Sequence, residues 1–212
     1  SDDMPLNSGK LISIEGGEGA GKTTVFNAIS QYLSDVGITV IGTREPGGTE
    51  VGERIRQVLL SPDHRIVPEA ELLLMFASRT QLVRELIRPA LAQGQYVLTD
   101  RFTDASFAYQ GGGRGLPLAQ IEALERDFVG IHPDLTLLLD LGVEQGMARA
   151  QARGQALDRI ELERTDFFLR VREAYLKRAK CEPDRIVLID ASQPQDDVVR
   201  QVLAAVGRWM KA

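Results

Sequence analysis

The stretch that decides the fold is Gly16-Gly17-Glu18-Gly19-Ala20-Gly21-Lys22-Thr23. It fits the spacing G-x-x-x-x-G-K-[S/T], in which glycines let backbone N–H groups converge on the oxygens of a phosphate. An apolar strand over residues 11–15 precedes it, and a helix that begins at Thr23 follows it. The N-terminus of that helix adds partial positive charge. A glycine-rich turn that binds nothing would not need this context, so the pattern predicts a phosphate-binding loop.

Two side chains of this loop carry specific chemistry. We expect Lys22 to reach the β- and γ-phosphates of a nucleoside triphosphate and the Thr23 hydroxyl to ligate Mg²⁺. The loop alone does not separate a kinase from a GTPase or a motor ATPase. The chain contains no Asn-Lys-x-Asp element of the kind that GTPases use to read guanine, and its 212 residues are few for a motor protein.

The rest of the chain alternates apolar segments of strand length with helical patterns. Such an alternation predicts an α/β fold of the P-loop NTPase type, with a doubly wound parallel five-stranded sheet, helices on both faces and a small lid. No linker divides the chain, so we expect a single domain over residues 1–212, with the lid at about 144–160. We expect a loop at Gly111–Gly113. The predicted strands are 11–15, 38–41, 96–100, 135–140 and 186–190, and the predicted helices are 23–36, 49–60, 68–92, one from 117, 145–153, 164–180 and 195–210.

Composition narrows the class of partner. The chain has 25 Lys and Arg against 30 Asp and Glu, a net charge of −5, which argues against a general nucleic-acid binder. Its single cysteine excludes a disulfide framework and cysteine-rich zinc sites. No apolar run approaches the roughly 18–20 residues that span a bilayer, and the N-terminus has no secretory segment. We therefore expect a cytoplasmic protein that binds a small anionic ligand, with no nucleic-acid and no membrane partner.

Polar clusters follow two of the predicted strands. Thr43-Arg44-Glu45-Pro46-Gly47-Gly48-Thr49 comes after the strand at 38–41, and Thr99-Asp100-Arg101-Phe102 closes the strand at 96–100. Ligands of open α/β sheets bind beyond the carboxyl ends of the strands. The two clusters therefore point to a site at that edge of the sheet.

An aromatic and a basic side chain lie between these clusters. Phe76 and Arg79 are three residues apart in a predicted helix, so they share a face. An aromatic ring beside a planar guanidinium can stack on a flat base and donate to its edge. Taken alone, the pair is more typical of a core phenylalanine beside a solvated arginine.

The two strand-end clusters together resemble a known family. Thr43–Thr49 and the segment Asp100-Arg101-Phe102-Thr103-Asp104-Ala105-Ser106-Phe107-Ala108-Tyr109-Gln110 are similar to the signature segments of thymidylate kinases. The resemblance extends from the first strand to about Arg170. It implies a P-loop kinase that uses ATP and Mg²⁺ to convert dTMP to dTDP, in dTTP biosynthesis, and that is typically a homodimer.

The resemblance also implies roles in binding the base and the sugar. Phe76 would stack on thymine, and Arg79 would donate to the carbonyl edge of the base. Ser106 and Gln110 would complete the base pocket. Tyr109 would lie under the deoxyribose, where it would exclude a 2′-hydroxyl.

Further roles concern the phosphates. Arg101 would bind the phosphate of dTMP, with Arg56 and Glu45 nearby. Glu18 would approach the 3′-hydroxyl of the sugar, and Asp100 would lie near the metal ion or its waters. Lys22, Arg101, Asp100 and Glu18 are thus the candidate catalytic residues outside the lid.

The lid supplies the last candidate. Some thymidylate kinases carry an arginine inside the phosphate loop, but this chain has Gly19 next to Glu18. It resembles the variant in which basic residues of the lid take that role. Arg149 and Arg153 are four residues apart on one predicted helix face, and Arg159 follows. We favour Arg153 as catalytic and expect Arg149 to bind ATP.

The predicted reaction is an in-line transfer of the γ-phosphoryl group of ATP to dTMP. The acceptor phosphate is already an anion near neutral pH, because its second pKa is about 6, so no strong general base is needed. Two alternatives remain open. One is a kinase for another deoxynucleotide or a deoxynucleoside, and the other is a nucleotide-binding regulatory switch.

Overall fold

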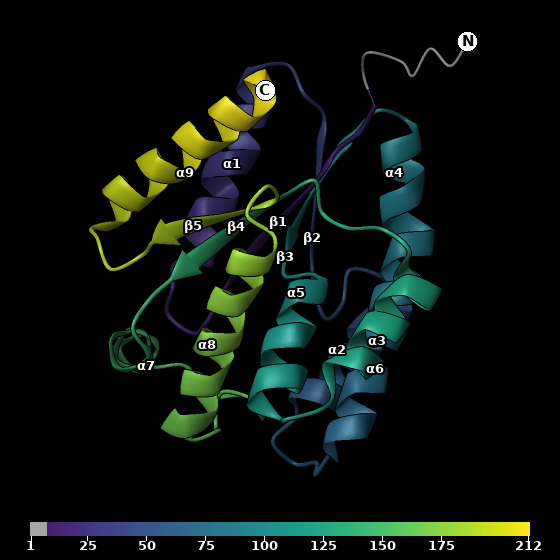
Figure 1. Cartoon of the computed structure of the whole chain (residues 1–212), viewed down its shortest axis with the longest axis vertical. Helices are drawn as coiled ribbons and strands as arrows, with labels where there is room; N and C mark the ends of the chain where they lie inside the picture. The colour runs from purple at the N-terminus through teal and green to yellow at the C-terminus, as the bar shows by residue number, and fades with distance from the viewer. Residues whose placement is uncertain (1–7) are drawn as a thin grey trace.

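The computed structural model describes residues 8–212. Within these residues a five-stranded parallel sheet forms the centre of the molecule, in the order β2-β3-β1-β4-β5 (Figure 1). The central place of β1, with later strands added on both sides, confirms the predicted doubly wound α/β fold. The strands are β1 (Leu11–Gly16), β2 (Val40–Arg44), β3 (Tyr96–Asp100), β4 (Leu135–Asp140) and β5 (Ile186–Asp190).

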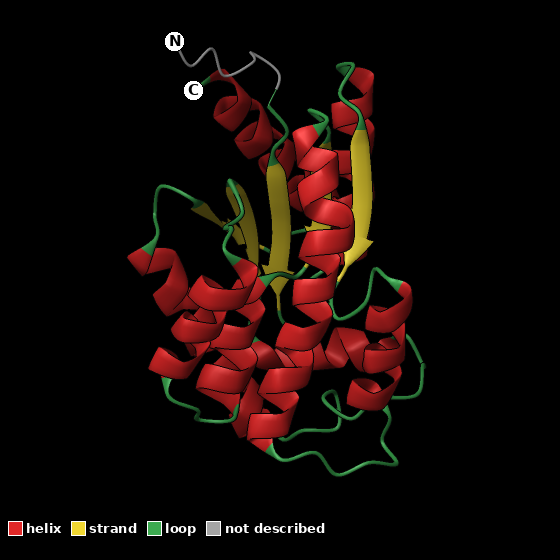
Figure 2. Cartoon of the chain, turned by 90° about the vertical axis from the view of Figure 1, so that its right-hand side faces the viewer, coloured by secondary structure: helices red, strands yellow, loops and turns green. Residues whose placement is uncertain are grey.

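Helices surround this sheet and also extend beyond it. Figure 2 shows the strands pointing with their carboxyl ends into a half of the molecule built of helices and loops. The α-helices are α1 (Lys22–Asp35), α2 (Glu50–Leu60), α3 (Pro68–Leu82), α4 (Arg88–Ala92), α5 (Thr103–Ser106), α6 (Leu118–Leu124), α7 (Val143–Ala152), α8 (Thr165–Cys181) and α9 (Gln195–Lys211). Three π-helical segments continue α-helices: η1 (Val83–Ile87), η2 (Phe107–Gly113) and η3 (Glu125–Val129).

Both faces of the sheet are buried. Successive strand residues point to opposite faces, so Ile12 packs with Ile29 of α1 and Val202 of α9, whereas Leu11 packs with Ile87 of η1 on the other face. A strand covered on both sides needs apolar residues at every position rather than at alternate ones. β1 is accordingly apolar at three of its first four positions, and its buried polar residues, Ser13 and Glu15, are both hydrogen-bonded.

The glycines at 111–113 do not form the loop that we expected. They lie at the end of η2, which packs along α8. A Cβ atom at Gly112 would lie 2.6 Å from the Cβ of Ala174, and one at Gly113 would lie 2.4 Å from the ring of Phe167. The glycines therefore permit a close approach of two helical segments, which a sequence pattern does not distinguish from a flexible loop.

Two element boundaries also differ from the prediction. β2 spans Val40–Arg44 rather than 38–41, because it pairs with β3 in a register that places Arg44 opposite Asp100. The predicted helix at 68–92 is a continuous helical segment, but η1 interrupts its regular α-helical turns.

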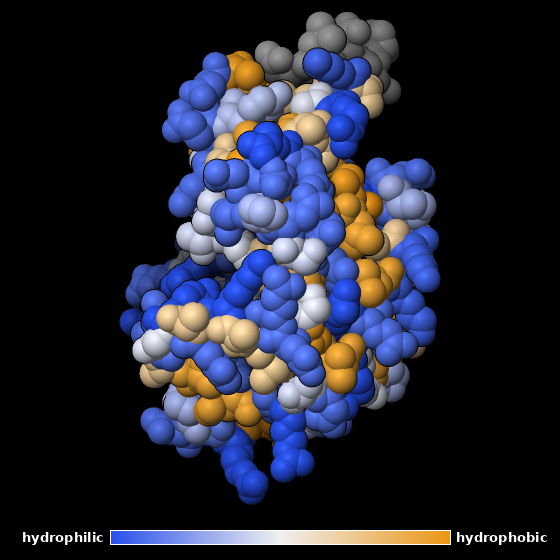
Figure 3. All heavy atoms as spheres, turned by 90° about the vertical axis from the view of Figure 1, so that its left-hand side faces the viewer, coloured by the Kyte–Doolittle hydropathy of each residue, from blue (hydrophilic) through white to orange (hydrophobic). Residues whose placement is uncertain are grey.

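The surface carries mostly polar residues on the face shown in Figure 3, with apolar residues visible in patches between them. Among the helices of residues 8–212, none is both long enough and apolar enough to cross a membrane.

Candidate active site

The phosphate loop connects β1 to α1, as the sequence predicted. Gly19 and Gly21 adopt left-handed backbone conformations, with φ angles of 74° and 84°. The Nζ atom of Lys22 lies 3.1 Å from Oδ1 of Asp100 at the end of β3. Burial and the nearby charge of Arg101 lower the pKa of Lys22, while Asp100 opposes this shift. The lysine is thus held at the carboxyl edge of the sheet, beside the loop that would hold phosphates.

Arg101 is held in a conformation that is rare for a residue with a side chain. Its φ angle is 72°, and it is the one residue other than glycine with a positive φ among residues 8–212. The Arg101 N–H donates to the carbonyl of Ile14 at 2.9 Å, and its carbonyl accepts from Oγ1 of Thr99 at 2.8 Å. The next N–H, of Phe102, donates to the Glu15 carboxylate at 2.8 Å. Strained residues of this kind persist only where neighbours fix them, and they cluster at functional sites.

The guanidinium of Arg101 lies between the phosphate loop and α8. It is 3.3 Å from the hydroxyl of Tyr109 and 3.5 Å from a carboxylate oxygen of Glu18. Its Nε atom is buried and has no hydrogen-bond partner among the described residues. A buried donor without a partner is costly, so this N–H is available to an anionic ligand.

A cavity of about 530 Å³ opens next to Arg101, and we call it the central cavity. It brings together residues from the phosphate loop, the β2–α2 connection, α3, η2 and the lid. Its walls contain nearly all of the predicted dTMP-binding residues. The lining residues are Glu18, Glu45, Pro46, Arg56, Leu60, Met75, Arg79, Arg101, Ala105, Ser106, Tyr109, Gln110, Asp158 and Ile160.

Phe76 is the exception, because it does not line the central cavity. Its ring is buried in the core under α3, beneath the guanidinium of Arg79 at 4.7 Å, and it borders an outer groove with Leu124 and Phe128. Met75 lines the cavity instead. Residues three and four positions before Arg79 both share its helix face, so spacing alone could not decide between them. The structure therefore places Phe76 outside the central cavity, where we had expected it to stack on the base.

Arg79 is fixed by three hydrogen bonds. It donates to Oε1 of Glu45 at 2.7 Å, to Oγ of Ser106 at 2.9 Å and to the carbonyl of Phe102 at 3.2 Å. Burial raises the pKa of Glu45 to about 7, although the charge of Arg79 opposes this shift. Arg79 is therefore a rigid, buried donor at the cavity wall and not a solvated side chain.

Sequence reasoning missed the central role of Glu71 on α3. This fully buried carboxylate accepts hydrogen bonds from Gln110, Arg114 and Arg159. Arg159, one of three candidate lid arginines, is thus bound to α3, and it also donates to the carbonyl of Leu59 at 2.6 Å. It is not free to act on a phosphoryl group. Gln110 and Arg159 lie 39 and 88 residues from Glu71 in the chain, so no local spacing could have revealed these contacts.

The other two lid arginines lie on or near α7. Arg149 donates to the carbonyl of Ala191 at 3.1 Å, after β5. Arg153 is exposed at the end of α7. Burial alone would raise the pKa of Glu18, but the charges of Arg101, Lys22 and Arg153 lower it below its usual value. The charge of Arg153, at the end of α7, therefore acts on Glu18 of the phosphate loop.

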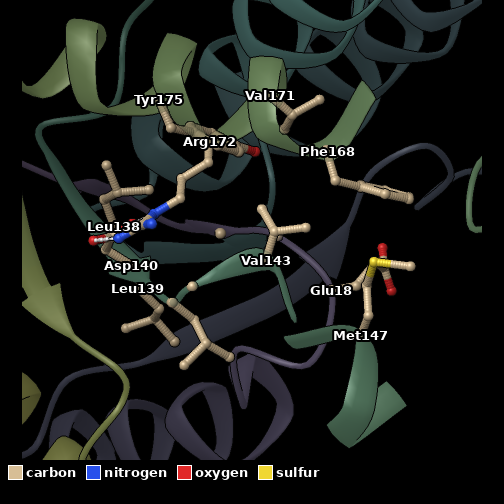
Figure 4. Close-up of a pocket in the computed structure, with 14 residues that line it drawn as sticks. Glu18, Leu138, Leu139, Asp140, Val143, Met147, Phe168, Val171, Arg172 and Tyr175 are labelled. Atoms are coloured by element: carbon tan, nitrogen blue, oxygen red, sulfur yellow. Dashed lines mark hydrogen bonds and ion pairs between the residues drawn. The ribbon is translucent and has the colours of Figure 1, made fainter. Parts of the chain in front are cut away.

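An apolar cavity of about 450 Å³ separates α7 from α8 beside the phosphate loop (Figure 4). Met147 of α7 and Phe168 of α8 line it, and Glu18 lies beside Met147. Arg172 closes the opposite end through a two-fold contact with the Asp140 carboxylate, at 2.9 and 3.0 Å. The cavity therefore lies between α7, α8 and the end of β4, next to Glu18 of the phosphate loop.

The residues proposed for a metal ion offer oxygen donors. Thr23 is exposed at the start of α1, and Asp100 is partly buried. Burial would raise the pKa of Asp100, but Lys22 and Arg101 lower it, so the carboxylate is ionised. Within residues 8–212, no group of three or more His, Cys, Asp and Glu side chains forms a metal cluster. This donor set fits Mg²⁺, which binds through one or two protein oxygens and fills its remaining positions with phosphates and water.

Fold and site together define a class of protein: a P-loop kinase, with a phosphate loop, a strained arginine beyond β3 and a cavity beside that arginine. A family model for thymidylate kinase matches residues 14–202. A thymidylate kinase of Pseudomonas fluorescens (strain Pf0-1) is 57% identical over 88% of this chain and 90% of its own length. That of Ruthia magnifica is 52% identical over 93% of this chain and 97% of its own.

A solved structure agrees with these sequence matches. The crystal structure of thymidylate kinase from Ehrlichia chaffeensis superposes with a TM-score of 0.77 at 30% identity, over 94% of this chain and 99% of that one. The chain belongs to the thymidylate kinase family, and the predicted activity, phosphorylation of dTMP, is the activity of that family.

Proposed function

We propose that this chain transfers the γ-phosphoryl group of ATP to the phosphate of dTMP, in line, to give dTDP. The observation that carries the proposal is the position of Arg101. Its guanidinium contacts Glu18 of the phosphate loop on one side and Tyr109 of the central cavity on the other. A phosphate group held by Arg101 would therefore face the loop that holds the donor.

The chemistry needs positioning and charge neutralisation more than proton transfer. A phosphate monoester is already an anion near neutral pH, since its second pKa is about 6. The difficulty is to bring two anions together and to stabilise the charge on the transferring group. Lys22 and Arg101 are partly buried cations at this point, and a charge acts more strongly where less water screens it.

Thr23 and Asp100 would hold Mg²⁺. When bound, the ion neutralises charge on the β- and γ-phosphates. The chain's own contribution is to fix the two oxygen donors. Lys22 holds Asp100 through a 3.1 Å contact, and the start of α1 positions Thr23.

The central cavity supplies the acceptor pocket. Arg79 donates to a carbonyl of the base, and Gln110 and Ser106 complete the polar edge. Tyr109 would lie under the sugar, where its ring would exclude a 2′-hydroxyl; its place in the wall of the central cavity supports this role. The contacts with the face of the base come from Met75, which takes the role that we first assigned to Phe76. A thioether is polarisable and makes favourable contacts with aromatic rings.

The lid completes the charge around the transferring group. Arg153 is the candidate, because Arg159 is bound to Glu71 and Arg149 to the carbonyl of Ala191. An arginine in this role contributes about 10³–10⁵ in rate in related phosphoryl transfers. Closure of the lid also excludes the water that would otherwise hydrolyse ATP.

The chain acts as a homodimer in this proposal, as a cytoplasmic enzyme of dTTP biosynthesis. An apolar groove on α3, α6 and η3 supports the dimer. Its walls include Leu73 and Phe128, which are 58% and 54% exposed. Exposed apolar grooves of this kind mark protein–protein contacts. Sedimentation equilibrium of the wild-type chain and of Leu73→Glu would detect the dimer and its loss.

An acceptor screen tests the reaction. The purified chain is given ATP and Mg²⁺ with dTMP, dUMP, dCMP, dGMP or thymidine, and ADP formation is measured. We expect ADP to form rapidly only with dTMP and more slowly with dUMP. The missing methyl of dUMP removes about 0.8 kcal/mol of burial, which is a few-fold effect. Slow hydrolysis that no acceptor accelerates would support a nucleotide switch and would refute the proposed function.

A further inference from the structure

Glu71 is a buried carboxylate outside the central cavity, and the mechanism above does not use it. It lies in the first turn of α3 and is 0% exposed. One oxygen, Oε1, accepts from Nε2 of Gln110 at 2.7 Å and from Nε of Arg114 at 3.2 Å. The other, Oε2, accepts from Arg114 at 3.1 Å and from Arg159 at 2.6 Å. Both oxygens are therefore fully engaged.

The surroundings keep Glu71 ionised. Burial alone would raise its pKa, but the hydrogen bonds and charge of Arg114, with the bonds from Gln110 and Arg159, lower the pKa below its usual value. An ionised carboxylate accepts hydrogen bonds and donates none. Any group that faces Glu71 must therefore be a donor.

This requirement fixes the side-chain amide of Gln110. A glutamine amide has a donor NH₂ group and an acceptor oxygen, and it can be turned over to exchange them. Glu71 can accept a hydrogen bond only from the NH₂ group of Gln110. The amide oxygen of Gln110 therefore points away from Glu71. Gln110 is buried and lines the central cavity beside Ser106, to which Arg79 donates. The base pocket thus has an acceptor, Gln110, near a donor, Arg79.

We propose that Glu71 is a positioning residue that sets the base selectivity of this kinase, because it turns the Gln110 oxygen toward the base. A pyrimidine with a ring N–H beside a carbonyl, such as thymine or uracil, matches an acceptor beside a donor. In cytosine the ring nitrogen is an acceptor and would face the Gln110 oxygen, which is also an acceptor. The amino group of cytosine is a donor and would face Arg79, which is also a donor. The inference rests on the proposed function, since it concerns the acceptor of that reaction.

The alternative orientation of Gln110 is disfavoured by the protein before any ligand binds. It would place the amide oxygen against an ionised carboxylate in a buried site, where water does not screen the repulsion. Selectivity then comes from a fixed pocket, because its polar groups stay without hydrogen-bond partners when the wrong base binds. Pockets built in this way reject a mismatched analogue by large factors, about 10⁴ or more.

Glu71→Gln tests the proposal. Arg114 and Arg159 can only donate hydrogen bonds, so the amide oxygen of the introduced glutamine must face them. Its NH₂ group then faces Gln110. Gln110 then turns over and presents its own NH₂ group to the base. We expect the ratio of kcat/KM for dTMP to that for dCMP to fall at least tenfold, mostly through a higher KM for dTMP, with the KM for ATP unchanged.

Two variants serve as matched controls. Glu163 also binds Arg114, at 2.5 Å, but it does not contact Gln110. We expect Glu163→Gln to disturb the same arginine and to leave the dTMP to dCMP ratio as it is. If Glu71 acts through Gln110, then Glu71→Gln should change the ratio little in a Gln110→Leu background, where no amide can turn over.

The outcomes separate the ideas. The role of Glu71 would be overturned if a folded Glu71→Gln variant kept the wild-type ratio of kcat/KM for dTMP to that for dCMP. An equal loss of kcat/KM with both nucleotides would leave this ratio unchanged and would count as the same result. No dTMP-dependent ADP formation by the wild-type chain would instead refute the proposed function itself.

A measurement on the wild-type protein applies if Glu71→Gln does not fold. In ¹⁵N-labelled protein the side-chain NH₂ signals of Gln110 are identified by their loss in Gln110→Leu. We expect these protons to exchange slowly with solvent before and after dTMP is added, because they remain on Glu71. Strong nuclear Overhauser effects between them and the thymine ring would show that the NH₂ group faces the base, and the proposal would be wrong.

Discussion

The buried pair of Arg79 and Glu45 gives a sharp prediction for Arg79→Met. The side chains of these two residues are 2% and 3% exposed, and they are joined by a 2.7 Å contact. Methionine fills most of the volume of arginine but removes its charge and its donors. The change leaves the Glu45 carboxylate buried and unpaired, and it removes the donors to Ser106 and to the carbonyl of Phe102.

The magnitude follows from the loss of one partner of a buried ion pair, which costs about 3–5 kcal/mol of stability. The cost depends on pH. The pKa of Glu45 is about 7 with Arg79 present, and it rises further when that charge is removed. A carboxyl whose pKa is higher in the folded than in the unfolded protein contributes most to the stability of the protein at low pH. That contribution is lost as the pH rises through the folded-state pKa. We therefore expect a smaller loss at pH 5.5, where Glu45 is protonated and only the donors to Ser106 and Phe102 are missing, and a loss that grows as the pH rises to 8.5.

Urea unfolding at both pH values measures this difference directly. Glu45→Gln combined with Arg79→Met supplies the control, since replacing both partners removes the unpaired charge and should restore most of the stability lost at pH 8.5. A loss below 1 kcal/mol that is the same at both pH values would show that the pair does not act as a buried ion pair. Binding of dTMP should remain weak in both variants, because the donor to the base is gone.

Three further predictions concern the site. Lys22→Ala should lower turnover at least ~10²-fold, as the loss of one transition-state donor does, and should leave the unfolding curve unchanged. Near-normal turnover in a coupled assay would show that the loop does not bind the phosphates of ATP in the way we propose. Arg153→Ala should lower kcat more than dTMP affinity by calorimetry, and a collapse of affinity with normal kcat would exclude it from the lid role. Met75→Ala should raise the KM for dTMP about tenfold, whereas Phe76→Leu should chiefly lower the stability of the protein, by about 1 kcal/mol. The reverse pattern would show that Phe76, and not Met75, contacts the base.

Glu15 gives a prediction about the pH dependence of folding. Burial, with the nearby charge of Asp104, raises the pKa of Glu15 to about 8. Its contribution to stability is therefore complete below pH 4.5 and is lost as pH rises through 8. Thermal unfolding from pH 6 to 9 should show a steeper fall in Tm for the wild-type chain than for Glu15→Gln. Parallel profiles would contradict the assignment.

The sequence was sufficient for those features that depend on local pattern. The phosphate loop between β1 and α1 follows from glycines and a lysine at fixed spacing, and a buried parallel strand follows from a short, mostly apolar run. The position of Asp100 and Arg101 at the carboxyl end of β3 follows in turn, because parallel strands end at one edge. The central cavity brings Arg101 together with Arg79, Tyr109 and Gln110, as the family resemblance implied.

Features that depend on packing between distant segments were not predictable. Met75 and Phe76 differ by one position on a helix, and only the placement of α3 against η2 decides which one lines the cavity. Glu71 has no motif, since its partners Gln110 and Arg159 come from 39 and 88 residues away. The glycines of η2 have the composition of a loop, and the close contact with α8 alone explains them.

The contacts of Arg149 and Arg159 have a consequence for how far the cleft can open. Arg149 is attached to the carbonyl of Ala191 beyond β5, and Arg159 to Leu59 and Glu71 on the acceptor side. The segment 150–158 is thus a tether between the two halves of the cleft. Its contour length, at roughly 3.3–3.6 Å per extended residue, sets an upper limit to their separation. Each residue deleted from the non-helical part of this tether, 153–158, would lower that upper limit by about the same length.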